Sequence, residues 1–179
     1  MSQPLEATIT FSEVSRIVWI TGLLPLVVIP AAFTGFWSWP SWTTINSILN
    51  SPIEIVLALL AGAFVHEILH GIGFLLGGAP LSSIRFGYIP KAMSAHISCS
   101  SMIPIAAFRL TILLPTIVLG VIPTALAFIT GSLPLVLWST LMLSACAGDF
   151  AMLAAVKKVP SNAKARVHGD LVGCVYVQP

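Results

Sequence analysis

The stretch IVLALLAGAFVHEILHGIGFLL, which occupies residues 55–76, decides how the rest of this chain can fold. It follows Ser51-Pro52-Ile53-Glu54, which has the spacing of a capping box and places proline at the first helical position, where a missing N–H costs nothing. Gly77 and Gly78 then supply a stop signal. A helix over residues 52–78 is about 39 Å long and crosses about 30 Å of hydrocarbon with its ends in the interfaces. The stretch therefore predicts a transmembrane helix.

The composition of the chain points the same way. Of its 179 residues, 57% are hydrophobic and 8% are charged, whereas a soluble domain carries about 25% charged residues. The eight Lys and Arg residues are spread along the chain and form no continuous phosphate-binding stripe, which excludes a nucleic-acid binder. Cys99, Cys146 and Cys174 form neither a disulfide framework nor a CxxC motif. The chain is predicted to be an integral membrane protein whose first partner is the lipid bilayer.

Three further apolar runs are long enough to cross the membrane, at about residues 17–37, 104–130 and 133–156. Thr10-Phe11-Ser12-Glu13 has capping-box spacing and starts the first of these helices. Pro115 and Pro123 are expected to kink the third span or to line a gap beside it. We predict an all-α integral membrane protein with four transmembrane helices, a single membrane domain over residues 1–179 and a tail over 157–179.

The segment 79–102, between the second and third spans, is the least apolar internal stretch. Ile84, Phe86 and Tyr88 alternate there with polar or small residues, which predicts a short strand or hairpin lying against the membrane. With four spans, this loop, the N-terminus and the tail share one side, and all eight Lys and Arg residues fall on or within reach of it. Arg109 reaches that side by extending its flexible stem. The positive-inside rule predicts that both termini are cytoplasmic.

Apart from Arg109 and from Glu54 in the first turn of the second span, four acidic or histidine residues lie within the predicted spans, and such residues are costly in lipid and usually functional. His66-Glu67-Ile68-Leu69-His70 is an HExxH motif on the second span. Its two histidines stand about 40° apart around a helix, so both imidazoles can reach one zinc ion. Glu67 flanks that face, where it can take a proton from a metal-activated water as catalytic base.

The fourth of these residues, Asp149, is the candidate for a third metal ligand. His70 and Asp149 each lie about 10 to 12 Å in from the same predicted membrane surface, counted at 1.5 Å per helical residue. Three protein ligands would leave one position for water, as in a catalytic zinc site. His96, in the 79–102 loop, is an auxiliary candidate that could serve as a ligand, as a transition-state stabiliser or as a solvated histidine.

Other interpretations of these residues stay open at this point. The histidines could form hydrogen bonds across the helix bundle while Glu67 pairs with Arg109, and Asp149 could make a single helix-to-helix hydrogen bond. Metal content would then be nil, as expected for a structural or scaffolding membrane protein.

Together, HEILHGIGF in a membrane helix, a following loop with a histidine, AGDFAML in the last span and a tail containing DLVGC resemble the putative zincin peptidase family. The resemblance covers roughly Glu54 to the C-terminus. It implies an intramembrane zinc metallopeptidase with His66, His70 and Asp149 as ligands and Glu67 as catalytic base. The arrangement is also similar to the site-2 proteases, although their aspartate is followed by glycine, whereas here Gly148 precedes Asp149.

The function that we expect is zinc-dependent hydrolysis of peptide bonds in membrane-embedded or membrane-proximal substrates. An extended substrate could add as a strand to an edge in the 79–102 segment. The alternative is a non-hydrolytic metal carrier or sensor, since histidines and carboxylates within spans also mark ion pathways. A transporter should offer ligands at several depths, whereas His66, His70 and Asp149 lie at one level.

Overall fold

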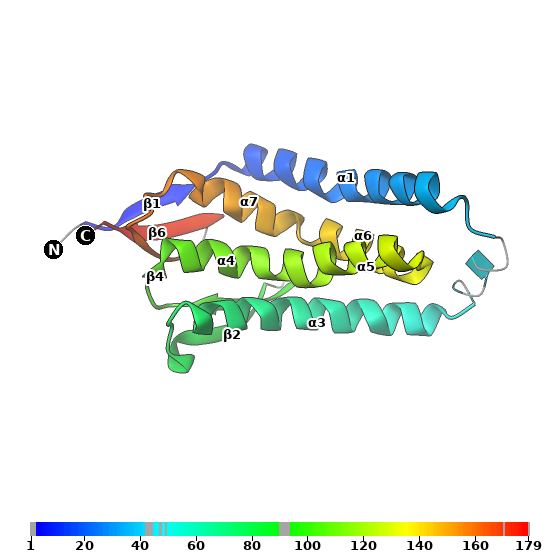
Figure 1. Ribbon diagram of the computed structural model, residues 1–179. Coiled ribbons are helices and arrows are strands. Elements are labelled where there is room, and N and C mark those ends of the chain that lie inside the picture. The colour runs from blue at the N-terminus through cyan, green and yellow to red at the C-terminus, as the bar shows by residue number, and fades with distance from the viewer. Residues whose placement is uncertain are drawn as a thin grey trace.

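A computed structural model describes residues 3–41, 45–46, 48, 50–89, 94–169 and 171–178 of the chain. Within these residues, four helical stretches are long and apolar enough to cross a membrane, namely Phe11–Trp37, Pro52–Leu76, Ile105–Thr130 and Leu133–Lys158. They correspond to the four predicted spans, and the chain is a multi-pass membrane protein. Figure 1 shows the helices running along one another, with both chain ends at the same end of the bundle.

The first two spans begin differently, although both carry a capping-box pattern. Helix α1 (Phe11–Trp37) has the predicted box, because the Glu13 N–H donates to Thr10 Oγ1 at 3.4 Å and the Thr10 N–H donates to Glu13 Oε2 at 2.9 Å. Helix α3 (Pro52–Leu76) begins at the predicted proline, but the Ser51 side chain makes no capping hydrogen bond. That box is therefore a wrong prediction, and the fixed φ of Pro52 is what favours a helix start there.

The third and fourth spans are both interrupted. The third consists of α4 (Ile105–Pro115), a π-helical turn η3 (Thr116–Val121) and α5 (Ile122–Thr130), so the irregular turn lies between the two prolines that were expected to distort it. The fourth consists of α6 (Leu133–Ala145), α7 (Ala147–Ala155) and a short 3-10 turn η4 (Val156–Lys158). The break between α6 and α7 falls at Cys146 and starts a new helix just before Asp149.

Helix packing sets the position of the HExxH helix. Helix α3 packs mainly along α4, while α1 packs along α6 and α7. A β-carbon on Gly73 of α3 would lie 2.7 Å from the Thr111 Cα of α4, so only glycine allows the two backbones to approach this closely. The three largest fully buried side chains, Phe108, Ile103 and Ile105, belong to one core cluster, at the end of the bundle that also carries the strands.

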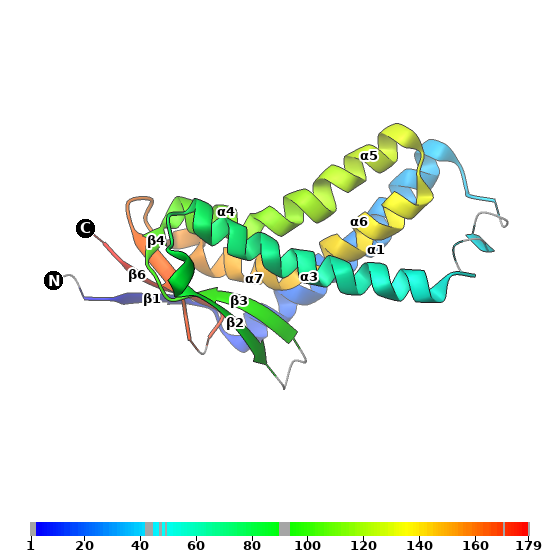
Figure 2. The same ribbon diagram turned by 90° about the horizontal axis from the view of Figure 1, so that it is seen from below.

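The structure also contains two antiparallel sheets, so the chain is mostly helical and the all-α prediction is wrong. The hairpin β2 (Ile84–Ile89) and β3 (Ser94–Cys99) confirms the strand expectation for the 79–102 loop and follows a short 3-10 turn η1 (Leu81–Ser83). The four-stranded sheet was not predicted. It has the order β1-β6-β5-β4, formed by β1 (Leu5–Thr8), β6 (Gly173–Val177), β5 (Lys164–Val167) and β4 (Ile103–Pro104). Figure 2 shows both sheets at the end of the bundle that holds the two termini.

Arg109 of α4 forms hydrogen bonds with the end of the fourth span that lies near the four-stranded sheet. Its Nη2 donates to the carbonyl oxygens of Val156, Lys157 and Val159, at 3.0, 3.2 and 2.7 Å. These carbonyls lie where α7 and η4 end, and the Val156 oxygen also accepts the Val159 N–H at 3.2 Å, so the guanidinium adds to the capping of this helix end. The alternative in which Arg109 pairs with Glu67 is therefore wrong.

Gly173, in the DLVGC tail, is required by the pairing of β1 with β6. Its φ is +152°, and a β-carbon there would overlap the carbonyl oxygen of Ala7. We predict that Gly173→Ala lowers the free energy of unfolding by about 2 kcal/mol or more, because the backbone of β1 would have to move. Thermal unfolding in detergent is the measurement. Gly169→Ala is the matched control, since a β-carbon at Gly169 would meet nothing within 4 Å. Equal unfolding midpoints for the two variants would contradict this account.

Candidate metal centre

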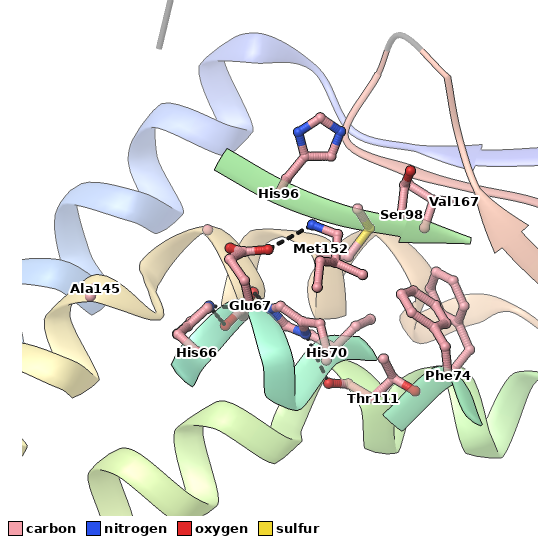
Figure 3. Close-up of a pocket in the computed structure, with 15 residues that line it drawn as sticks. His66, Glu67, His70, Phe74, His96, Ser98, Thr111, Ala145, Met152 and Val167 are labelled. Atoms are coloured by element: carbon pink, nitrogen blue, oxygen red, sulfur yellow. Dashed lines mark hydrogen bonds and ion pairs between the residues drawn. The ribbon is translucent and has the colours of Figure 1, made fainter. Parts of the chain in front are cut away.

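The structure brings together His66 and His70 of α3 with Asp149 of α7. The two histidine Nε2 atoms lie 3.2 Å apart. The His66 Nε2 lies 3.3 Å from Asp149 Oδ2, and the His70 Nε2 lies 3.2 Å from Asp149 Oδ1. The histidines share a face because they are one helical turn apart, and Asp149 reaches them from the first turn of α7, just after the break at Cys146. Figure 3 shows the two imidazoles directed into the same space.

These three residues match the donor set of a catalytic zinc. With bonds of about 2.0 to 2.1 Å, two ligands of a tetrahedral zinc lie about 3.3 Å apart. The two histidine nitrogens are 3.2 Å apart, and each lies 3.2 or 3.3 Å from an Asp149 oxygen, His66 from Oδ2 and His70 from Oδ1. Asp149 Oδ2 is moreover a buried oxygen that receives no hydrogen bond within the described part of the chain. A cation would neutralise this carboxylate, and three ligands would leave a fourth position open for water. Among the described residues, this is the one group of three such side chains that could hold a metal ion.

The outer nitrogen of each imidazole faces a different partner. The His70 Nδ1 lies 3.0 Å from the Thr111 carbonyl oxygen. Because a carbonyl only accepts, the proton sits on Nδ1 and the His70 Nε2 carries the lone pair that a metal needs. The His66 Nδ1 lies 3.8 Å from Cys146 Sγ. Sequence reasoning missed both partners: one is a backbone atom, and Cys146 was considered only for a disulfide or a CxxC motif.

Glu67 is directed away from the three ligand atoms and toward the hairpin. Its Oε2 accepts a hydrogen bond from the Ile97 N–H of β3 at 2.7 Å, drawn as a dashed line in Figure 3. The HExxH glutamate therefore lies between the candidate metal position and β3, and it does not belong to the ligand group. The contact brings the 79–102 loop into the site.

His96 lines the same cavity but lies on the other face of β3. The Ile97 side chain points toward α3, where its Cδ1 lies 3.5 Å from the place of a β-carbon on Gly71. Because neighbouring strand residues alternate, the His96 ring points away from α3 and covers Gly87, as Figure 3 shows for the ring itself. His96 does not join the ligand group, although its Nδ1 is buried with no hydrogen-bond partner among the described residues.

The site is a partly enclosed cavity of about 320 Å³. The side chains of His66, His70 and Asp149 are 13%, 14% and 16% exposed, so they are sheltered without being sealed. Phe74, Phe108 and Met152 make part of its wall apolar. The cavity combines a polar floor with a hydrophobic wall, as small-ligand and active sites do.

We predict that His66→Ala and Asp149→Ala each weaken zinc binding by more than about 100-fold, since losing a direct ligand costs more than the 10- to 100-fold typical of an outer partner. His96→Ala should keep its zinc, because the ring lies on the far face of β3. The measurement is zinc content of purified protein after dialysis against a chelator. If Asp149→Ala kept its zinc and His96→Ala lost it, the third ligand would be His96 and the assignment of Asp149 would be wrong.

Comparison with known proteins identifies the chain. A family model described as putative zincin peptidase matches residues 59–164, which is more than half of the chain. The matched segment contains the HExxH motif, the hairpin and Asp149. No curated protein and no solved structure matches the chain. The chain belongs to the putative zincin peptidase family.

Proposed function

We propose that this protein is an intramembrane zinc metallopeptidase that hydrolyses peptide bonds of membrane-embedded or membrane-proximal substrates. The observation that carries the proposal is the convergence of the His66, His70 and Asp149 donor atoms from two helices, one from each residue within 4.8 Å of the others. The family match supports the same class of reaction. We assign the metal ligands to these three residues.

We assign the proton transfers to Glu67. When bound, zinc supplies Lewis-acid chemistry, which polarises a carbonyl group and makes a water acidic enough to lose a proton near neutral pH. Glu67 accepts the proton of the attacking water and delivers it to the leaving amine. Its Oε2 is held by the Ile97 N–H, which leaves Oε1 as the oxygen for these transfers. The apolar wall formed by Phe74 and Phe108 limits access of other water.

The hairpin is the proposed seat for an extended substrate. Strand β3 pairs with β2 along one edge, and its other edge faces α3, as the Ile97 contact with Glu67 indicates. A peptide that pairs with that edge beyond the Ile97 N–H, which Glu67 occupies, would lie along the cavity that contains the HExxH motif. Binding at this edge favours a substrate segment that is unwound over one that is an intact helix, because only an extended backbone can pair with a strand.

Charge supports an orientation with both termini in the cytoplasm. Arg16, Arg85, Arg109, Lys157, Lys158, Lys164 and Arg166 belong to the elements at the end that carries the two sheets, whereas Lys91 lies outside the described residues. Under the positive-inside rule, this end and the site near it face the cytoplasm. We predict that a peptide tag after Pro179 reacts with a membrane-impermeant antibody only once cells are permeabilised. Labelling of intact cells would instead place the C-terminus outside the cytoplasm and contradict the proposed orientation.

A metal carrier or sensor is the second candidate function. Carriers need ligands at several depths along a route, and the described residues contain one such group, at a single level. The position of Glu67 beside this group and outside it also favours hydrolysis.

Glu67→Gln separates the two functions. We predict that it keeps its zinc, because the three ligands remain, and that cleavage of a membrane-embedded reporter falls by about 10² to 10⁴-fold, the range typical of losing a general base. Zinc stoichiometry and cleavage in liposomes are measured on the same preparation. Glu54→Gln is the matched control, since Glu54 lies in the first turn of the same helix and is exposed.

Two outcomes contradict the assignment of Glu67 as base. One is cleavage by Glu67→Gln at the rate of the Glu54→Gln control. The other is loss of zinc from Glu67→Gln to the level of His66→Ala, which would make the glutamate a ligand and favour the carrier.

A further inference from the structure

The hydrogen bond between β3 and the HExxH helix uses a backbone group that the hairpin itself leaves free. In the β2–β3 register, Ile97 is opposite Phe86. Antiparallel pairs alternate between residues that exchange hydrogen bonds and residues whose N–H and C=O face outward. Because the Ile97 N–H donates to Glu67 Oε2, Ile97 is at an outward-facing position, and the bond costs the hairpin no ladder contact.

Nothing within α3 itself fixes the Glu67 carboxylate. Glu67 is adjacent to His66, about 100° around the helix from it, and its side chain has three rotatable bonds. Charge-assisted bonds from a backbone N–H to a carboxylate are short and roughly twice as strong as neutral ones, and the 2.7 Å distance is of this kind. One such bond selects one side-chain conformation from several.

We infer that the backbone amide of Ile97 is a positioning group for Glu67, by which the hairpin holds the catalytic base in place. This inference rests on the proposed function, because it concerns the residue assigned as base. It makes the 79–102 loop part of the catalytic apparatus as well as a substrate seat. The donor is a main-chain atom, so any side chain at position 97 that preserves the strand also preserves the bond.

Ile97→Pro removes the N–H and spares the ladder, because proline is accepted in strands where the N–H faces away from the neighbouring strand. Ile97→Ala is its matched comparison: it keeps the N–H and removes the side chain that packs near Gly71. We expect kcat of Ile97→Pro to be at least 10-fold below that of Ile97→Ala, with KM within about 3-fold, since a misplaced base slows proton transfer. Zinc content should be equal in the two variants.

A second measurement needs neither activity nor metal. In full-length protein labelled with ¹⁵N-isoleucine, the Ile97 amide should be protected from hydrogen exchange in the wild type and in Glu67→Gln, whose side-chain oxygen still accepts the bond. Exchange should be at least 10-fold faster in Glu67→Ala. Equal exchange in all three proteins would overturn the inference, including in the case where Ile97→Pro does not fold.

The outcomes also separate this inference from the proposed function. If the wild type cleaves, Glu67→Gln does not, and Ile97→Pro has the kcat of Ile97→Ala, the proposed function stands and the positioning role of Ile97 is overturned. If the zinc-loaded wild type cleaves no membrane-embedded reporter, the proposed function fails, and the role of Ile97 in catalysis fails with it.

Discussion

The contact of the Asp149 carboxylate with two imidazoles is the constraint on which the rest of the structure depends. A carboxylate within a membrane span is costly unless it is paired, and its partners are on α3, a helix distant in sequence. The break at Cys146 begins a new helix and places Asp149 in its first turn, facing the histidines. The fold must therefore hold α3 and α7 at matching depths.

Two sets of contacts made by α4 hold α3 and α7 at matching depths. Gly73 allows α3 to pack directly on the backbone of Thr111, whose carbonyl then orients His70. Arg109, two residues before Thr111 on α4, caps the far end of the fourth span through three carbonyls. Helix α4 thus contacts both α3 and α7, which couples the packing of the bundle to the geometry of the candidate metal centre.

The HExxH motif is contacted by two independent elements with different roles. Helix α7 supplies a carboxylate to the face that carries both histidines, while β3 supplies a backbone donor to the glutamate beside that face. The candidate metal ligands and the proposed base are therefore held by separate parts of the chain. This division fits the proposed chemistry, in which the ligands must stay fixed and the base must exchange a proton.

The sequence by itself determined the membrane class, the four spans and the candidate residues, because these follow from local composition, from 3.6-residue periodicity and from spacing within one helix. The hairpin could also be predicted from the sequence, because its two strands are adjacent in the chain. The four-stranded sheet could not be predicted, because β1 and β6 come from opposite ends of the chain and strand pairing at that distance leaves no local pattern. Only the tertiary structure decided that Arg109 caps a helix, that His96 faces away from α3 and that the Ile97 amide binds Glu67. These outcomes depend on which backbone and side-chain atoms meet across elements, and residue type and spacing along one segment do not contain that information.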